Sequence, residues 1–256
     1  MITLTNNIRK TVTQLDKAKY RKESGLFMAE GTKCVLDTIE SFRLRWLFAT
    51  DRWAAEHAAT AKRHFEALCI VPHKDLERMS HLTTPPEVMA VYEIPERHAD
   101  IDSLVPNLYL ALDGVQDPGN LGTIMRTADW MGITTIFCSP GSADLYAPKV
   151  VQSTMGAISR VKVIYHPLED IVTRFPYPVY GTFLDGEDIY RSQLREAALI
   201  VMGNEGRGIS PELDRLITHR LRIPSYPPEA TTSESLNVAV ATAICVAEFR
   251  RLQNYK

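Results

Sequence analysis

The chain has only four cysteines among 256 residues, and they lie far apart. Cys34, Cys69, Cys138 and Cys245 form no Cys-x-x-Cys pair and no Cys/His cluster at zinc spacing. This spacing excludes a zinc-ribbon type of site and a disulfide framework, and we expect a protein of the reducing cytoplasm.

The chain also lacks a long apolar run. Its N-terminus, residues 1–11, is polar and has no signal-peptide core. The longest apolar stretch, 236–247, is interrupted by Asn237 and Thr242 and is shorter than the roughly 20 residues that span a bilayer. We therefore expect a buried helix there and no membrane partner.

Charge of one sign is not in excess. There are 29 basic and 31 acidic side chains, giving a net charge of −2. A nucleic-acid partner would therefore have to be held by a local basic patch. The basic side chains of the first helical stretch are one such group: Arg9, Lys10, Lys17, Lys19, Arg21 and Lys22.

The length favours two domains. Residues 1–98 alternate short helical and strand patterns, which predicts a small α/β domain. The polar stretch 95–106, with Pro95 and Pro106 at its ends, predicts a linker, which we place at 99–106. Residues 107–256 contain continuous apolar strands that alternate with helices, which predicts a parallel sheet covered on both faces. Ligands bind at the strand ends of such sheets.

Three segments follow predicted strands of the second domain. The first, 117–129, contains Asn120 as a possible helix cap, Gly122 and Arg126; a plain turn with a surface arginine is the alternative. The second, 202–212, holds three glycines in the order GxxGxG, with Ser210 and Pro211 opening a helix. Neither the GxGxxG of dinucleotide enzymes nor a phosphate-binding GK[ST] is present.

The third segment runs from Ile223 through a proline-rich loop to Asn237. An asparagine inside the first turn of a buried helix needs hydrogen-bond partners. The alternative is a capping role for Ser233 or Ser235. The glycine-rich segment likewise has a second interpretation, as a turn without function, in which Glu205 pairs with Arg207 or caps backbone amides.

Together these segments resemble the three motifs of the SpoU (TrmH-like) family of RNA 2′-O-ribose methyltransferases, in the SPOUT superfamily. The resemblance spans residues 107–252, and its motifs are read in three places: Asn120-Leu121-Gly122 with Arg126; Tyr146, Pro148–Val151 and Ser153–Ala157; Gly203–Gly206 and Gly208 with Ile223-Pro224 and Ser235–Val238. The N-terminal part is similar to a substrate-binding domain through residues 25–31. It departs from that pattern at Pro86-Glu87, and the loop 225–232 is longer than usual.

The resemblance implies a deep trefoil knot that holds S-adenosylmethionine. Cofactor contacts would come from six residues: Thr182, Gly203, Asn204, Gly206, Ile223 and Leu236. The family assigns catalysis to Arg126, oriented with the ribose by four polar residues: Asn120, Glu205, Ser235 and Asn237. A guanidinium stays protonated at neutral pH, so Arg126 acts either as a phosphate clamp or, when desolvated, as a base.

The resemblance also implies a homodimer, built on the last helix and the 120–130 helix, and no metal. The expected function is methyl transfer to a ribose 2′-hydroxyl, with ribosomal RNA favoured over tRNA by the N-terminal domain. Two other classes compete: a catalytically silent RNA-binding or assembly protein of the same fold, and a small-molecule NAD enzyme. Cofactor-dependent methylation of RNA distinguishes a methyltransferase from the silent RNA-binding protein. The absence of GxGxxG argues against the NAD enzyme.

Overall fold

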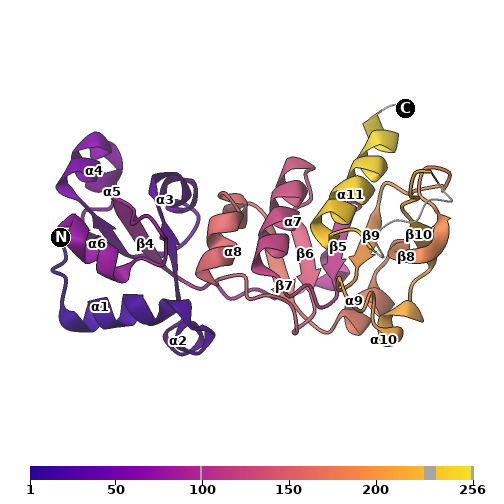
Figure 1. The fold of residues 1–256 in the computed structure, drawn as a ribbon, viewed down its shortest axis with the longest axis horizontal. Helices are drawn as coiled ribbons and strands as arrows, with labels where there is room; N and C mark the ends of the chain where they lie inside the picture. The colour runs from indigo at the N-terminus through magenta and orange to yellow at the C-terminus, as the bar shows by residue number, and fades with distance from the viewer. Residues whose placement is uncertain (99, 228–234, 255–256) are drawn as a thin grey trace. The chain divides into compact units, whose positions relative to one another are not determined.

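The computed structural model describes residues 1–98, 100–227 and 235–254, which divide into two compact units (Figure 1). The first unit joins Met1–Glu96 with Asp144–Ser159, and the second joins Arg97–Ala143 with the described part of Arg160–Lys256. None of the helices in the described ranges is long and apolar enough to cross a membrane.

The first unit is a four-stranded sheet with helices on its faces. Its strand order is β1-β4-β2-β3, with β4 antiparallel to β1 and β2, and β2 parallel to β3. Its elements are α1 (Asn6–Thr13), η1 (Gln14–Asp16), α2 (Ala18–Ser24), β1 (Leu26–Glu30), α3 (Thr32–Thr38), β2 (Leu44–Ala49), α4 (Asp51–Glu56), α5 (Ala58–Arg63), β3 (Leu68–Ile70), α6 (His73–Met79), β4 (Val88–Glu93), α8 (Pro148–Ser153) and η3 (Ala157–Ser159).

Segment 144–159 packs as part of this unit although it lies far along the chain. The Arg21 side chain is 4% exposed and donates to Asp144 Oδ2 at 2.5 and 3.1 Å and to the Leu15 carbonyl at 2.6 Å. The Phe27 and Tyr146 rings lie 4.6 Å apart between centroids. An ion pair and an aromatic contact therefore fasten the segment to α2 and β1.

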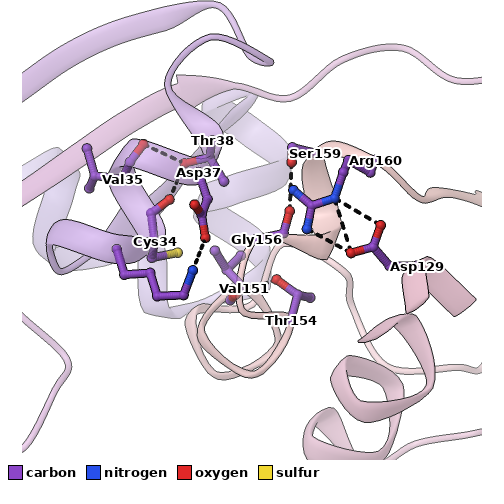
Figure 2. Close-up of polar contacts among 11 residues, drawn as sticks. Cys34, Val35, Asp37, Thr38, Asp129, Val151, Thr154, Gly156, Ser159 and Arg160 are labelled. Carbon is purple, nitrogen blue, oxygen red and sulfur yellow. Dashed lines mark hydrogen bonds and ion pairs between the residues drawn. The ribbon is translucent and has the colours of Figure 1, made fainter. Parts of the chain in front are cut away.

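Gly156 lies against Asp37 of α3 in this packing (Figure 2). A Cβ at this position would lie 2.6 Å from Asp37 Oδ2 on α3, and the backbone φ is +85°. Asp37 is itself held by Lys33 Nζ at 2.8 Å. Glycine is therefore required here by both space and backbone conformation.

The second unit is a six-stranded, all-parallel sheet in the order β10-β8-β9-β5-β6-β7, as the continuous apolar strands predict. Its elements are η2 (Ile101–Ser103), β5 (Leu108–Leu112), α7 (Pro118–Trp130), β6 (Thr135–Cys138), β7 (Lys162–Tyr165), α9 (Leu168–Arg174), β8 (Val179–Asp188), β9 (Ala198–Met202), α10 (Pro211–Asp214), β10 (His219–Arg222) and α11 (Val238–Asn254).

Helices cover both faces of this sheet. Tyr109 and Val201 on the strands pack against Ile171 of α9 and Leu213 of α10 in one buried cluster. The alternate residues of β5, such as Leu110, point to the opposite face, and α7 and α11 lie against one another (Figure 1). Both faces of β5 and β9 are therefore buried.

The order of the strands reverses between β5 and β9. The chain leaves β5 toward β6 and β7, whereas it leaves β9 toward the opposite edge, where β10 pairs with β8. Such a reversal separates the loops at the carboxyl ends of two neighbouring strands and opens a crevice for a ligand. The turn after β5 and the glycine-rich segment after β9 meet at this point.

Candidate functional site

Three of the predicted cofactor residues lie on adjacent strands, near the edge of the sheet at which β9 and β10 end. Gly203 follows β9, Thr182 lies in β8 and Ile223 follows β10, and these strands are neighbours in the sheet. Parallel strands end at the same edge, so residues that are 20 or more positions apart in the sequence share one rim of the sheet.

Three of the predicted catalytic residues are hydrogen-bonded to one another. Asn120 Nδ2 donates to Glu205 Oε1, and Asn237 Nδ2 donates to Asn120 Oδ1 at 3.0 Å. The partners come from α7, from the loop after β9 and from the residue before α11. One polar cluster therefore joins the first and third motif segments, beside the reversal of strand order.

Asn120 is not the cap of α7, contrary to the sequence-based prediction. The helix begins at Pro118, and the Asp117 side chain accepts a hydrogen bond from Asn120 N at 2.9 Å. Because Asp117 takes the capping role, the amide side chain of Asn120 is available for Glu205 and Asn237.

Asn237 precedes the last helix rather than lying inside its first turn. Its Oδ1 accepts from Ala239 N at 3.0 Å and from Val240 N at 3.2 Å, which is the geometry of a helix cap. The alternative cap Ser233 lies outside the described residues. Ser235 and Leu236 are exposed and lie just before this cap.

The side chain of Asn204 organises the glycine-rich loop. Its Oδ1 accepts from Gly206 N at 3.0 Å and Arg207 N at 3.2 Å, and its Nδ2 donates to the Gly114 carbonyl at 2.8 Å. The backbones of Asn204 and Gly208 also exchange hydrogen bonds of 2.9 and 2.8 Å. The Asn204 side-chain amide is thus engaged by backbone groups of the protein, and these bonds set the shape of the loop that begins at Gly203.

Gly203 is required by contact within the loop. An added Cβ would lie 2.3 Å from the Gly208 carbonyl carbon and 2.4 Å from Ile209 N. At Gly206 the nearest atom to an added Cβ is 3.6 Å away, so that position is open. The close approach that the glycine pattern indicates is therefore between two stretches of the loop itself.

Thr182 begins an irregular stretch of β8. The pairing with β10 shifts there, from Gly181 opposite Arg220 to Glu187 opposite Leu221. The Arg220 guanidinium lies 3.5 Å from the centroid of the Phe183 ring and donates to Asp185 at 2.8 Å. Arg220 also holds the pKa of the Asp185 carboxyl below its ordinary value. These contacts stabilise the irregular stretch of β8 next to Thr182.

Arg126 is exposed on α7 and stands apart from the cluster. Within residues 1–98, 100–227 and 235–254 its side chain has no hydrogen-bond or ion-pair partner. Six residues along a helix correspond to about 240° of rotation and about 9 Å of rise, so Arg126 and Asn120 face different directions. The sequence left open whether a bent helix would bring them together, and α7 runs without interruption.

The cysteine thiols are unsuited to nucleophilic chemistry. All four are buried. Burial raises the pKa of Cys34 to about 11 and that of Cys245 to about 12, and it raises the pKa of Cys138 as well. Thiols with such pKa values carry almost no thiolate at neutral pH.

Sequence reasoning missed two residues that tie the site together, Asp113 and Gly114. The Asp113 carboxylate accepts from Ser210 N at 2.7 Å, and the Gly114 carbonyl accepts from Asn204. A polar residue and a glycine directly after a buried strand were the available signal.

The Pro86-Glu87 departure from the pattern of the substrate-binding domain has a local explanation, because Glu87 accepts a hydrogen bond from the Thr50 hydroxyl at 2.5 Å.

The comparisons with known proteins agree with this geometry. The sequence profile of the SpoU rRNA Methylase family matches residues 107–247, and that of the MRM3-like substrate binding domain matches residues 6–90. The 23S rRNA (guanosine(2553)-2′-O)-methyltransferase RlmP of Bacillus subtilis is 34% identical over 171 residues, which is 65% of this chain and 66% of that protein.

Two solved structures match over nearly the full length. A TrmH-family protein from Porphyromonas gingivalis is 42% identical with a TM-score of 0.87, covering 97% of this chain and 99% of that one. An AdoMet-bound rRNA methyltransferase from Sinorhizobium meliloti is 30% identical with a TM-score of 0.85, covering 98% of each chain. The chain therefore belongs to the SpoU rRNA methylase family.

Proposed function

We propose that this protein transfers a methyl group from S-adenosylmethionine to a ribose 2′-hydroxyl of RNA, and that its substrate is ribosomal RNA. The observation that carries the proposal is the hydrogen-bonded cluster of Asn120, Glu205 and Asn237 beside the reversal of strand order. The relatives from Bacillus subtilis and Sinorhizobium meliloti, both named as rRNA methyltransferases, support the choice of substrate.

The residues at the rim of the sheet fit an adenosine and an amino-acid group. The loop 203–208 is closed on itself by the Asn204–Gly208 pair, and its tip at Gly206 is exposed. Thr182 adds a half-buried hydroxyl. Backbone amides, carbonyls and a hydroxyl are donors and acceptors of the kind that bind small polar ligands. Ile223 and Leu236 would add apolar contacts from the two ends of the third segment.

The protein's own groups have to orient and activate the ribose oxygen. S-adenosylmethionine supplies a methyl group on a good leaving group, so no metal is needed for the transfer. We assign the Glu205–Asn120–Asn237 cluster to hold the ribose and Arg126 to the RNA side, with Ser235 next to them. Exposed Arg126 suits a two-point clamp on an adjacent phosphate.

Residues 1–98 are proposed as the RNA substrate-binding domain, 99–106 as the linker and 107–256 as the methyltransferase domain. Local charge supports RNA binding, because residues 9–22 contain six basic side chains and one acidic residue, Asp16. Lys10, Lys17 and Lys22 are exposed there. The match of residues 6–90 to a substrate-binding domain agrees with this assignment.

We further propose a trefoil knot in the second domain and a homodimer built on it, in the cytoplasm. The insertion of β9 between β5 and β8 is compatible with a knotted path. The dimer is supported by apolar side chains left exposed on neighbouring helices, with Trp130 of α7 88% exposed and Val240 of α11 49% exposed. Light scattering at micromolar concentration tests the dimer, and a monomer would refute it.

Methylation of RNA tests the function directly. Total RNA from cells with and without the protein is mapped for ribose methylation, which identifies the target nucleotide. An RNA that carries a single 2′-deoxy substitution at that nucleotide should bind but not react, because only the hydroxyl differs. A site that maps to tRNA would revise the substrate, and cofactor-independent RNA binding without turnover would favour an assembly protein.

A further inference from the structure

Asp113 lies immediately after β5 and contacts Ser210, at the C-terminal end of the glycine-rich loop 203–210. Its backbone N–H donates to the Met202 carbonyl at 2.9 Å, which extends the pairing of β5 with β9 by one residue. Its Oδ2 accepts from Ser210 N at 2.7 Å. One residue thus contacts the chain both before the loop, at Met202, and after it, at Ser210.

Gly114 contacts Asn204, at the N-terminal end of the same loop. Its carbonyl accepts from Asn204 Nδ2 at 2.8 Å, and its own N–H donates to Ser139 Oγ at 2.8 Å, just after β6. The backbone φ of Gly114 is +67°, a conformation that favours glycine. The turn at 113–114 is therefore held by Ser139, just after β6, and it holds both ends of the loop 203–210.

Asp113 does not belong to the polar cluster of Asn120, Glu205 and Asn237. Its side chain contacts the backbone N–H of Ser210, whose hydroxyl makes no capping hydrogen bond to α10. Glu205 lies in the chain between these two held ends of the loop, so its position depends on them. A carboxylate at position 113 is therefore placed to set the shape of the loop without touching a ligand.

We propose that Asp113 is a positioning residue for the cofactor, which holds the loop 203–210 in its binding shape through Ser210 N–H. The inference rests on the proposed function, since it concerns the same cofactor site. Loss of the acceptor leaves a partly buried backbone donor unpaired, which weakens the bound shape of the loop. The methyl transfer step itself uses other residues.

The test measures S-adenosylmethionine affinity and turnover in the full chain. Asp113→Ala should raise the Kd for S-adenosylmethionine about tenfold, while kcat at saturating cofactor stays within about threefold of wild type. Asp113→Asn keeps an acceptor oxygen in the same place and should recover most of the affinity. An equal loss in both variants would overturn the proposal, because the acceptor would not be what matters.

A second variant removes the same hydrogen bond from its other side. Ser210 has φ −63° and ψ 148°, which proline adopts, so Ser210→Pro deletes the donor with little strain. It should weaken cofactor binding as Asp113→Ala does, and the double variant should be no weaker than either one. Additive losses would overturn the proposal by showing that the two residues act separately.

Thr218→Val is the matched control. Thr218 Oγ1 accepts from Val179 N at 3.0 Å and donates to the Val179 carbonyl at 2.8 Å, at the first residue of β8. This variant therefore loses side-chain to backbone hydrogen bonds that include one of the same type, away from the loop. It should leave the Kd unchanged. If wild type binds S-adenosylmethionine but Asp113→Ala binds it equally well, this inference fails alone. If wild type does not bind it, the proposed function fails.

Discussion

At the scale of single residues, Arg126 is assigned to the RNA side of the reaction. It is exposed and has no partner within the described part of the chain. If it clamps RNA, Arg126→Ala should lower single-turnover methylation by about 100-fold or more without changing S-adenosylmethionine affinity. Arg126→Lys should also fail, because an ammonium cannot form a planar two-point contact.

The control for this prediction is Arg191→Ala, which removes an arginine that is 86% exposed elsewhere in the unit. Its methylation rate should match wild type. Turnover of Arg126→Ala within a few-fold of wild type would make Arg126 an ordinary surface residue. Loss of cofactor binding would instead place it in the cofactor site.

The pairing of Asn120 with Glu205 predicts a rescue by exchange. Asn120→Asp sets a second carboxylate against Glu205 and should slow methylation by about tenfold to a hundredfold. Adding Glu205→Gln restores an amide–carboxylate pair in the opposite sense, and the new carboxylate at position 120 still accepts from Asn237. Single-turnover rates should recover at least partly. A double variant slower than Asn120→Asp would show that the contact does not matter.

At the scale of elements, the loop after β9 depends on one glycine. Gly203→Ala should weaken S-adenosylmethionine binding by about tenfold or more, because the added Cβ meets the Gly208 backbone and the loop has to shift. Gly141→Ala is the control, since an added Cβ there meets nothing within 4 Å. Calorimetric titration of both variants measures the difference. Equal affinities would place the cofactor elsewhere.

The packing of 144–159 on the first unit predicts an asymmetry between the two members of an ion pair. Asp144→Ala leaves the 4% exposed Arg21 guanidinium without its carboxylate and should lower the free energy of unfolding by about 3 kcal/mol. Arg21→Met should cost less, because Asp144 is 40% exposed and regains water. Arg52→Met, which breaks an exposed pair, should change little.

Urea unfolding of the full chain checks these three variants. The double variant Arg21→Met with Asp144→Ala should be close to Arg21→Met alone, since no buried charge then lacks a partner. Equal losses for the two single variants would mean that the contact is solvated and that other groups hold the segment.

At the scale of the whole molecule, the two units predict separable functions. A fragment of residues 97–256 contains every residue assigned to the cofactor, so it should bind S-adenosylmethionine within about threefold of the full chain. It should lose most RNA affinity, because the basic residues 9–22 are absent. Segment 144–159 loses its contacts with Arg21 and Phe27, so trypsin should cut at Lys149 faster than in the full chain.

Filter binding, calorimetry and timed proteolysis measure the three outcomes. RNA affinity equal to that of the full chain would remove the substrate-binding role from residues 1–98. Unchanged resistance at Lys149 would show that the segment folds without the first unit.

The sequence by itself determined the parallel sheet and the position of the motifs. Continuous apolar strands such as 108–112 and 199–202 report burial on both faces, which only helices on both sides of a parallel sheet provide. The resemblance to the family's motifs indicated Asn120, Glu205 and Asn237. Periodicity reports whether a side chain is buried, so it located elements well, and it missed short irregular ones such as α8.

Only the tertiary structure decided which residues meet. Asn120 contacts Glu205 and Asn237 across 85 and 117 positions of sequence, and Arg21 contacts Asp144 across 123. The tertiary structure also decided which residue caps α7. Asp117 is the cap, so the side chain of Asn120 is available to bond Glu205 and Asn237. A hydrophobic pattern has no information about a distant partner, because the path of the chain brings such groups together after the elements pack.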